Sequence, residues 1–302
     1  MPDRYTLSIS IMNLYIVIAV HNSRDITLTF LSLLSRQSFQ KFSIVVVDDG
    51  STDGTSEAVS KDFPEVSIIK GTGDWWWTRS MNEGIKYAID QGASAILMMN
   101  DDTYVLDSYI ETIVKISQEN PGAVIGSLDI TREEPRRIFF SGVEKMIWWK
   151  AKGINYHDSY DLYDPSLTGL HKSVCLNGRG TLVPVEVFNT IGLLDEEKLP
   201  QYASDFDFSL RADEAGINTF ISWDAVNFSY VQKTGEGKPF IKQKFGVYLR
   251  SFFSKYSQTS LSTNYAYYRK HCKWYYFHFA FSFHMLKLIY SYFKRRNAFS
   301  ET

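Results

Sequence analysis

The feature that most constrains the fold is a set of short apolar runs, each of which stops at polar residues. Residues 15–20 (YIVIAV) end at His-Asn-Ser, residues 42–47 (FSIVVV) end at two aspartates, and residues 95–99 (AILMM) end at Asn-Asp-Asp. Short runs rich in β-branched side chains are typical of strands buried on both faces of a parallel sheet. The polar ends therefore predict a sheet whose carboxyl edge carries the chemistry.

Segments with helical periodicity alternate with these runs. Short loops between alternating strands and helices predict a doubly wound α/β layer with a parallel sheet over residues 1–125. Ligands bind such sheets at the carboxyl ends of the strands, so the three polar ends should share one cleft. We expect helices over residues 25–35, 56–62, 81–91, 107–119, 185–191 and 205–215, and further strands at 66–69, within 175–184 and at 218–222.

Charge divides the chain into two parts. From Lys233 to the C-terminus there are 13 Lys and Arg residues and only two acids, Glu236 and Glu301. By subtraction from the totals of 32 bases and 34 acids, residues 1–232 carry a net charge of −13 and the remainder +11. We assign residues 1–232 to one α/β domain and residues 233–302 to a helical, aromatic and basic extension.

The two cysteines, Cys175 and Cys272, provide no disulfide framework, which fits a reducing compartment such as the cytoplasm. Residues 7–20 are apolar and follow Arg4, an arrangement that resembles a signal peptide. They lack a small-residue cleavage site, so a buried first strand is the preferred interpretation.

The first candidate site is the turn VVVDDGSTDGT, residues 45–55. Glycines and small polar residues after a buried strand let the backbone approach a ligand. Asp48 and Asp49 are candidates to accept hydrogen bonds from a nucleobase or a ribose. The alternative is a plain turn in which residues 51–53 cap the following helix. The turn matches neither a Walker A loop nor a GxGxxG motif.

The second candidate site is Asn100-Asp101-Asp102. Adjacent carboxylates at a strand end suit Mg²⁺ or Mn²⁺ bound to a diphosphate, because phosphates and water complete the metal shell. The alternative is a cap for the helix that begins near Asp107. The third candidate is Asp205, which opens a helix and is a candidate general base. Its alternative is an ordinary N-cap, and Asp207 and Arg211 are spaced to pair on the same helix.

In this order and spacing, the motifs resemble family 2 glycosyltransferases of the GT-A fold over residues 13–225. The resemblance rests on five segments: IAVHNSRD, VVVDDGSTDGT, WWWTRSMNEGI, MMNDDT, and LNGRGTLVP followed by LPQYASDFDFSLR. It implies a GT-A, mostly parallel α/β fold that binds a nucleotide-diphosphate sugar.

The resemblance also implies roles for individual residues. Ala19 and His21 would border the nucleobase, Asp49 would contact the base, and Asp101 the ribose. Asp102, with Asp101 beside it, would ligate the metal. Asp205 would deprotonate an acceptor hydroxyl that attacks the anomeric carbon with inversion. The backbone of Gly178, Arg179 and Gly180 would shape the sugar pocket.

The sequence departs from the family pattern at three points. Ser204 precedes Asp205 where many relatives carry a glutamate, which leaves Asp205 as the one candidate base. Asn100 stands where the metal motif often has a carboxylate. Residues 223–235 contain no histidine to act as a third metal ligand.

The segment GDWWWTRSMNEG, residues 73–84, is unusual because three consecutive tryptophans cannot share one face of a regular element. We expect one ring, Trp76, in the cleft, where it can stack on a sugar or base, and others packed on the core. Arg79 is a candidate phosphate contact. Asn82 and Gly84 are expected to begin a helix near the ligand. Similar segments occur in enzymes of surface-polysaccharide assembly, including rhamnosyltransferase-like ones.

Residues 264–296 combine many aromatic side chains with flanking basic clusters. His278, His284 and Lys287 interrupt the apolar character, which favours helices lying on an anionic membrane surface over a membrane-spanning segment. Docking within the protein, or in an oligomer such as a homodimer, is the main alternative. The acidic body argues against nucleic-acid binding.

These observations predict a metal-dependent, inverting hexosyl- or deoxyhexosyltransferase of cell-surface polysaccharide synthesis. We expect a UDP-, dTDP- or GDP-sugar donor, a glycan or lipid-linked acceptor, and a cytoplasmic enzyme bound peripherally to the inner face of the membrane. Two alternatives are a non-catalytic module that binds sugar nucleotides or glycans, and a nucleotidyltransferase, whose Arg- or Lys-bearing glycine loop is absent after the first strand.

Overall fold

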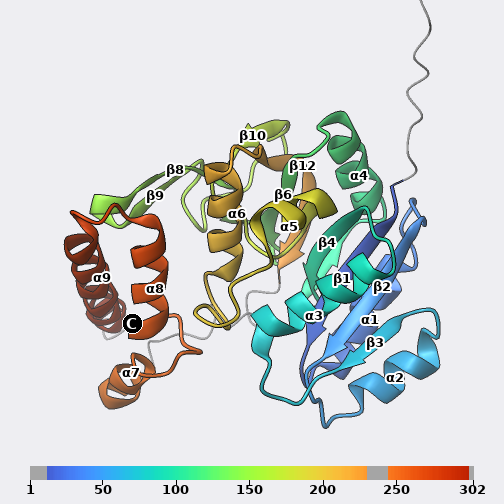
Figure 1. The fold of residues 1–302 in the computed structure, drawn as a ribbon, viewed down its shortest axis with the longest axis horizontal. Coiled ribbons are helices and arrows are strands. Elements are labelled where there is room, and N and C mark those ends of the chain that lie inside the picture. The colour runs from blue at the N-terminus through green and yellow to red at the C-terminus, as the bar shows by residue number, and fades with distance from the viewer. Residues whose placement is uncertain (1–11, 230–243, 299–302) are drawn as a thin grey trace, which may run out of the picture.

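The computed structural model describes residues 12–229 and 244–298. A large twisted sheet forms the centre of the molecule, helices cover both of its faces, and three C-terminal helices lie together at one side (Figure 1). The border predicted between residues 232 and 233 lies outside the described residues, as does the start of the apolar segment at residues 7–11.

The main sheet has ten strands in the order β10-β12-β6-β11-β4-β1-β2-β3, with β5 paired to β12 and β7 paired to β6. Strands β3, β2, β1 and β4 are parallel, as are β6 and β12, whereas β11 runs antiparallel between β4 and β6. The strands are β1 (Leu14–Val20), β2 (Phe42–Asp48), β3 (Ser67–Lys70), β4 (Ala95–Asn100), β5 (Thr103–Val105), β6 (Val124–Thr131), β7 (Ile138–Phe140), β10 (Leu170–Lys172), β11 (Thr181–Pro184) and β12 (Thr219–Ser229). A separate hairpin pairs β8 (Val143–Ile147) with β9 (Lys152–Asn155).

Helices pack on both faces of this sheet, which is why its strands are apolar throughout. One apolar cluster joins the sheet to α1 (Arg24–Leu34), α2 (Thr55–Asp62) and α4 (Tyr109–Glu119). The other joins it to α3 (Trp76–Asp90), α5 (Val185–Ile191) and α6 (Ser204–Glu214). In β1, Ile16 and Ile18 face the first cluster and Val17 faces the second, as strand alternation requires.

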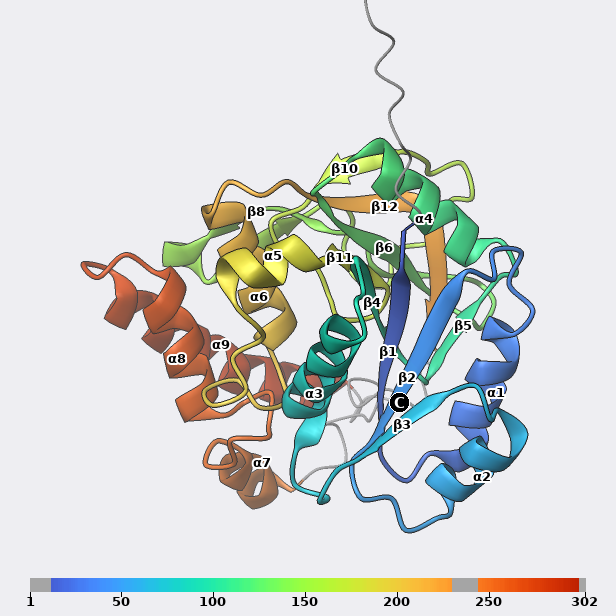
Figure 2. The same ribbon diagram turned by 45° about the vertical axis from the view of Figure 1, so that its right-hand side comes forward.

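The doubly wound α/β layer predicted from the sequence is confirmed, and Figure 2 shows α3 and α1 on opposite sides of β1 and β2. The helix predicted at 81–91 begins earlier, at Trp76, because the tryptophan segment supplies its first turn. The strand predicted at 218–222 continues to Ser229, where it pairs with β5 and β6. Residues 125–163, which show no clear period, form β6 to β9 and a short 3-10 helix, η1 (Trp148–Lys150).

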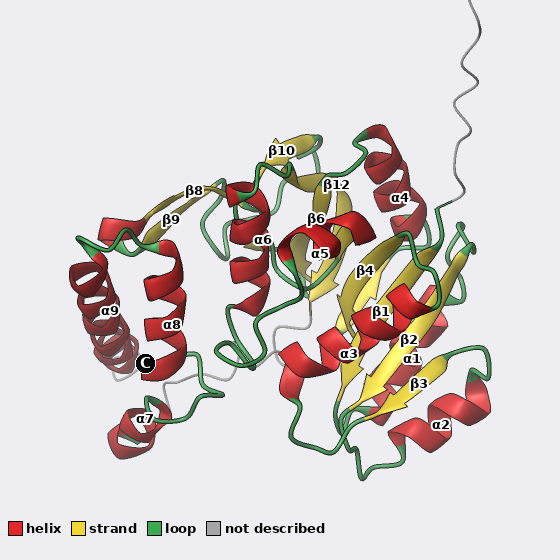
Figure 3. Cartoon of the chain, in the orientation of Figure 1, coloured by secondary structure: helices red, strands yellow, loops and turns green. Residues whose placement is uncertain are grey.

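The C-terminal part contains α7 (Phe245–Ser251), α8 (Leu261–His271) and α9 (Phe277–Ala298), drawn as coiled ribbons in Figure 3. Helix α8 is docked on the α/β domain, because its Tyr267, Tyr268 and the adjacent Cys272 are buried in one cluster with Cys175. Docking within the protein thus accounts for α8. None of the helices in the described ranges combines the length and apolarity needed to cross a membrane.

Candidate active site

The carboxyl ends of three parallel strands lie side by side. Ala19 of β1 is in register with Val47 of β2 on one side and with Asn100 of β4 on the other. The polar residues that follow each strand, including His21, Asp49 and Asp102, are therefore placed at the same edge of the sheet. This is the edge at which doubly wound proteins bind ligands.

The antiparallel strand β11 brings a second set of residues to this edge. Because Thr181 of β11 lies opposite Met98 of β4, the turn before β11 sits where β4 ends. This turn holds Gly178, Arg179 and Gly180. Gly180 adopts φ +85°, and a Cβ on it would lie 2.5 Å from both Tyr109 Oη and Asn227 Nδ2. A glycine is needed here so that Arg179 can reach the end of β4.

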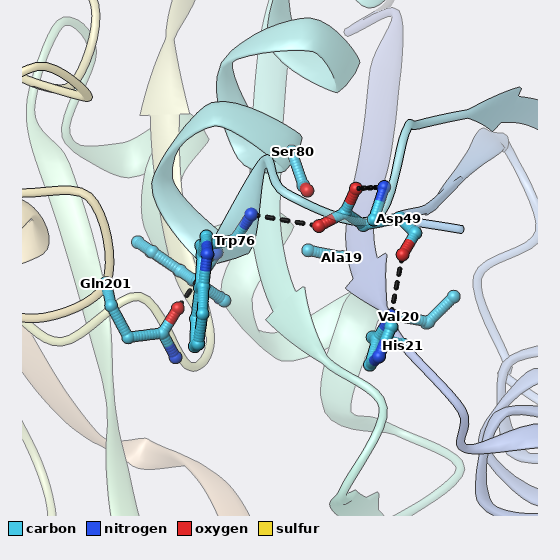
Figure 4. A pocket seen from close by; sticks show the side chains of 9 residues that line it. Ala19, Val20, His21, Asp49, Trp76, Ser80 and Gln201 are labelled. Atoms are coloured by element: carbon cyan, nitrogen blue, oxygen red, sulfur yellow. Dashed lines mark hydrogen bonds between the residues drawn. The ribbon is translucent and has the colours of Figure 1, made fainter. Parts of the chain in front are cut away.

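The first cavity, of about 290 Å³, opens at the ends of β1 and β2 (Figure 4). Ala19, His21 and Trp76, all predicted to contact the nucleotide, line it together with Asp49. The Nδ1 atom of His21 lies 2.6 Å from the carbonyl oxygen of Asp49, which fixes the imidazole at the rim. The remaining lining residues are Val20, Gly73, Trp77, Ser80 and Gln201.

The Asp49 carboxylate organises the wall of the first cavity. Its Oδ1 accepts the backbone N–H of Gly73 at 2.7 Å, and its Oδ2 accepts those of Trp75 at 3.0 Å and Trp76 at 2.9 Å. Each such bond satisfies a backbone donor that would otherwise be buried without a partner. Asp49 thus holds the entry to α3 in place around the cavity.

The three tryptophans diverge, as the sequence predicts. Trp76 is 40% exposed and its ring stacks on Tyr256 at 3.9 Å between ring centres. Trp75 and Trp77 are partly buried against the core. Trp77 Nε1 donates to Asn100 Oδ1 at 3.0 Å, and its ring lies so close to Gly178 that a Cβ there would clash at 2.3 Å.

The second cavity adjoins the first and is larger, about 690 Å³, and Trp77 and Gln201 line both. It contains Asp102 from the end of β4 and Asp205 from the first turn of α6. Residues from distant parts of the chain complete its walls: Asn100, Phe139, Phe140, Val143, Asn155, Ser159, Asn177, Gly178, Arg179, Tyr202, Ala203, Phe206 and Gln258. Because they share Trp77 and Gln201, the two cavities form one cleft with two compartments.

Asp205 is held by backbone donors. Its Oδ2 accepts the N–H of Gly178 at 2.9 Å, and its Oδ1 accepts that of Phe206 at 2.9 Å. Burial raises the pKa of Asp205 above its ordinary value, although these two bonds oppose the shift. A carboxylate with a raised pKa, fixed at the wall of a cavity, has the properties of a general base.

Asp102 is suited to hold a divalent cation. Its Oδ1 is buried with no hydrogen-bond partner among the described atoms, and Arg179 Nη2 lies 3.6 Å from its Oδ2. Arg179 also contacts Asp129 and Ser229, which anchor the guanidinium. Within residues 12–229 and 244–298, no three His, Cys, Asp or Glu side chains group as a metal site. A cation at Asp102 would need oxygen ligands from a bound diphosphate and water.

Two of the predicted ligand contacts have structural roles instead. Asp48 is buried, lines neither of the two cavities, and accepts bonds from the Ser51 N–H and the Ser56 hydroxyl, so it stabilises the turn as in the alternative interpretation. Asp101 lines neither cavity either. Its Oδ2 accepts from the hydroxyls of Ser23 at 2.5 Å and Thr27 at 2.8 Å. The chain turns after Asn100, so adjacent carboxylates diverge: Asp101 faces α1 and Asp102 faces the cleft.

Three further residues predicted to contact the ligand are absent from the linings of the two cavities. Arg79 lines neither cavity, and its guanidinium lies 5.1 Å from the ring centre of Trp75. Asn82 is buried within α3 and bonds to Leu194 and Glu196, so it ties this helix to a loop rather than to a ligand. Gly180 is not among the lining residues, but Gly178 and Arg179 of the same turn line the second cavity, so the prediction that this turn shapes the sugar pocket stays a prediction.

Several residues of the cleft were not predicted. Gln201 accepts the N–H of Trp77 at 3.0 Å and lines both cavities. Its position in the sequence, just before the helix that carries Asp205, is the feature from which it could have been predicted. Phe139 and Asn155 come from a region without a clear sequence period. Gln258 belongs to the C-terminal part, which the sequence motifs do not reach.

Comparison with known proteins identifies the family of this chain. Residues 15–175 match the model of the family described as glycosyl transferase family 2, and the chain belongs to that family. A curated relative, the dTDP-rhamnosyl transferase RfbF of Shigella flexneri, is 24% identical over 205 residues. The match covers 68% of this chain and 64% of the relative, so the chain spans less than two thirds of the relative's length.

Solved structures share the GT-A fold with this chain. The mannosyltransferase PcManGT from Pyrobaculum calidifontis, in complex with GDP-Man and Mn²⁺, has a TM-score of 0.57 at 14% identity, covering 90% of this chain and 69% of that one. GalNAc-T7 with UDP, GalNAc and Mn²⁺ has a TM-score of 0.64 at 13% identity, covering 86% and 48%. TarS of S. aureus has a TM-score of 0.53 at 15% identity, with the same coverage.

Proposed function

We propose that this family 2 glycosyltransferase is metal-dependent and inverting. It moves a sugar from a nucleotide-diphosphate sugar to a hydroxyl of a glycan or lipid-linked acceptor in cell-surface polysaccharide synthesis. The observation that carries the proposal is the placement of Asp102, with its unpartnered oxygen, and Asp205, with its raised pKa, on the walls of one cavity. The non-catalytic alternative leaves this pairing unexplained.

Each compartment has a part in the proposed reaction. The first cavity holds the nucleoside. Trp76 provides an aromatic face for stacking, and His21 borders the cavity at its rim. The second cavity holds the transferred sugar and the acceptor. Arg179 is placed to bind the diphosphate, and Asp102 would hold Mg²⁺ or Mn²⁺, which would supply positive charge to the departing diphosphate. Two of the solved structures of similar fold are described as complexes with Mn²⁺.

The reaction needs one proton acceptor. Asp205 takes the proton of the acceptor hydroxyl while the hydroxyl oxygen forms a bond to the anomeric carbon. The bond from that carbon to the nucleoside diphosphate breaks on the opposite side, and the diphosphate departs with the electron pair. Asn177 and Tyr202, which line the same cavity, are placed to contact sugar hydroxyls.

The donor is expected among UDP-, GDP- and dTDP-sugars. We propose a dTDP-sugar such as dTDP-rhamnose as the first to test, because the curated relative is described as a dTDP-rhamnosyl transferase. We also propose that the acceptor is carried on a lipid and that the enzyme acts at the cytoplasmic face of the membrane. A homodimer is part of the same proposal.

The test is a thermal-shift and nucleotide-release screen of the three donor classes, with and without Mn²⁺. One class is expected to raise the Tm only with the metal, and at a ligand concentration 100-fold above Kd the stabilisation should reach about 2.7 kcal/mol. Asp102→Asn should abolish the metal-dependent part, whereas Asp101→Asn, whose carboxylate faces α1, should retain it. Equal donor binding with and without metal in the wild type would contradict metal dependence.

A further inference from the structure

The outer face of α9 carries an uncovered row of large apolar side chains, which we call the α9 stripe. Its members are spaced alternately four and three residues apart, so they lie along one side of the helix. Their exposed fractions are high for such side chains. The α9 stripe consists of Phe279 (61% exposed), Phe283 (37%), Leu286 (63%), Tyr290 (68%) and Phe293 (42%).

The opposite face of α9 is fixed to the protein. Phe277, Ala280 and Met285 are buried against neighbouring residues, and Lys287 Nζ donates to the carbonyl oxygens of Lys150 at 2.6 Å and Ala151 at 3.2 Å. The helix therefore has a docked inner face and a bare outer face. In Figure 1, α9 lies at the edge of the molecule, on the far side of α8 from the sheet.

Two features of the surroundings identify what would cover the α9 stripe. Trp274 and Tyr275, just before the helix, are 79% and 62% exposed and extend the aromatic surface. The sequence contains no Asp or Glu between Glu236 and Glu301, whereas residues 294–296 are Lys-Arg-Arg. Exposed aromatic and aliphatic side chains in a segment of net positive charge are the properties of a surface that binds anionic lipid.

A second copy of the chain fits this surface less well. A spacing of four and three residues also occurs in helix pairs, where charges of opposite sign flank the apolar seam. Here Lys294, four residues after Tyr290, lies beside the stripe, and the sequence between Glu236 and Glu301 contains no acidic residue to pair with it. Two copies would bring positive charge against positive charge.

We propose that the α9 stripe docks the protein on an anionic phospholipid surface, with the helix lying in the plane of the membrane. This surface is separate from the catalytic cleft, but α8 connects the two. Lys270 of α8 contacts Asp207 Oδ1 at 2.7 Å, and Asp207 lies on the same helix as Asp205. A membrane-bound α9 would thus hold the cleft at a fixed orientation to the lipid surface.

The experiment measures sedimentation of the full chain with phosphatidylcholine vesicles, with and without added phosphatidylglycerol, at low and high salt. The wild type should bind the anionic vesicles and be released by salt, because surface charge is screened. The variant Phe279→Ser/Leu286→Ser should weaken binding at least about tenfold. The matched control Leu106→Ser/Leu162→Ser removes two side chains that are also exposed, by 51% and 64%, elsewhere on the surface, and should bind as the wild type does.

Three results would overturn the proposal. The first is wild-type protein that does not sediment with anionic vesicles, and the second is an α9 variant that binds them as tightly as the wild type. The third is a dimer, detected by light scattering, that Phe279→Ser/Leu286→Ser converts to a monomer. The last would assign the stripe to a second copy. Tyr290→Ser provides an independent variant if the double variant folds poorly. No donor or acceptor is present in the measurement, so its outcome does not depend on the proposed transfer reaction.

Discussion

Two faces of α6 carry aspartates with opposite electrostatic character. Asp205 faces the second cavity, accepts hydrogen bonds from two backbone N–H groups, and has a pKa raised by burial. Asp207, two residues on, faces α8. Burial alone would raise the pKa of Asp207, but hydrogen bonds from His271 and Lys270 and the charge of Arg211 lower it to about 2.

The difference separates the carboxylate proposed as the base from one with a structural role. A carboxylate surrounded by cations is stabilised in its charged form and is a poor proton acceptor. A carboxylate whose pKa is raised by burial accepts a proton more readily. The side chain of Asp207 is fully buried, and it joins the α/β domain to the C-terminal helices, whereas Asp205 lines the second cavity.

The largest effect is expected from Asp205→Asn, which removes the proposed base but preserves the side-chain shape. The transfer rate should fall by about 10²- to 10⁴-fold, whereas the free energy of unfolding should fall by only about 1 kcal/mol because one backbone bond is lost. Turnover of the donor and urea unfolding measure the two effects. The matched control is Asp213→Asn. Asp213 lies on the same helix as Asp205 and forms a partly exposed ion pair with Lys172 of β10. Full transfer by Asp205→Asn would refute its assignment as the base.

Asp207→Asn should mainly lower the free energy of unfolding, whereas Asp205→Asn should mainly lower the transfer rate. It leaves Lys270, Arg211 and His271 without their shared buried partner, and breaking a buried ion pair costs about 3–5 kcal/mol of unfolding free energy. Urea unfolding at neutral pH measures the loss, with Asp213→Asn again as the control. A change below about 1 kcal/mol would indicate that apolar contacts of Tyr267 and Tyr268 hold α8 instead.

The pH dependence should separate the two aspartates. Asp205 must be ionised to act as the base, so the acid limb of kcat/KM should lie above the ordinary aspartate pKa of 3.8. Since the folded-state pKa of Asp205 is raised, its protonated form stabilises the fold at low pH. This contribution to the free energy of unfolding is lost as the pH rises through the raised pKa. Asp207 has a lowered pKa, so its contribution is fully present above pH 3.8 and is lost as the pH falls towards about 2. A rate profile and unfolding curves over the same pH series check both; an acid limb at or below 3.8 would contradict the role of Asp205.

The smallest effect is expected at the contact between the C-terminal part and the first cavity. Tyr256→Ala removes the ring that stacks on Trp76 at an interplanar angle of 11°. Such a pair contributes about 0.5–1.5 kcal/mol, so donor affinity should weaken by roughly two- to tenfold with little change in kcat. Titration calorimetry with the donor measures it, and Tyr256→Phe, which keeps the ring, is the control. Unchanged affinity would show that the backbone of Trp76 alone positions its ring.

Much of the fold and part of the site followed from local sequence. The apolar runs at β1, β2 and β4 identified the strands because burial on both faces requires continuous apolar residues. Strand ends also located His21, Asp49 and Asp102 correctly at one edge. The contacts of Asp101 were not predictable, because Ser23 and Thr27 are more than 70 residues away in the chain.

The sequence by itself determined the doubly wound sheet, the polar residues at its carboxyl edge and the family to which the motifs point, because these depend on local periodicity and spacing. Tertiary structure decided which carboxylate of each adjacent pair faces the cleft. Asp49 and Asp102 line it, whereas Asp48 and Asp101 bond to hydroxyl groups inside the protein. It also decided that Asp207 binds Lys270, whereas the carboxylate of Asp205 accepts the backbone N–H groups of Gly178 and Phe206. Those choices depend on which distant segments pack together, and no local pattern encodes them.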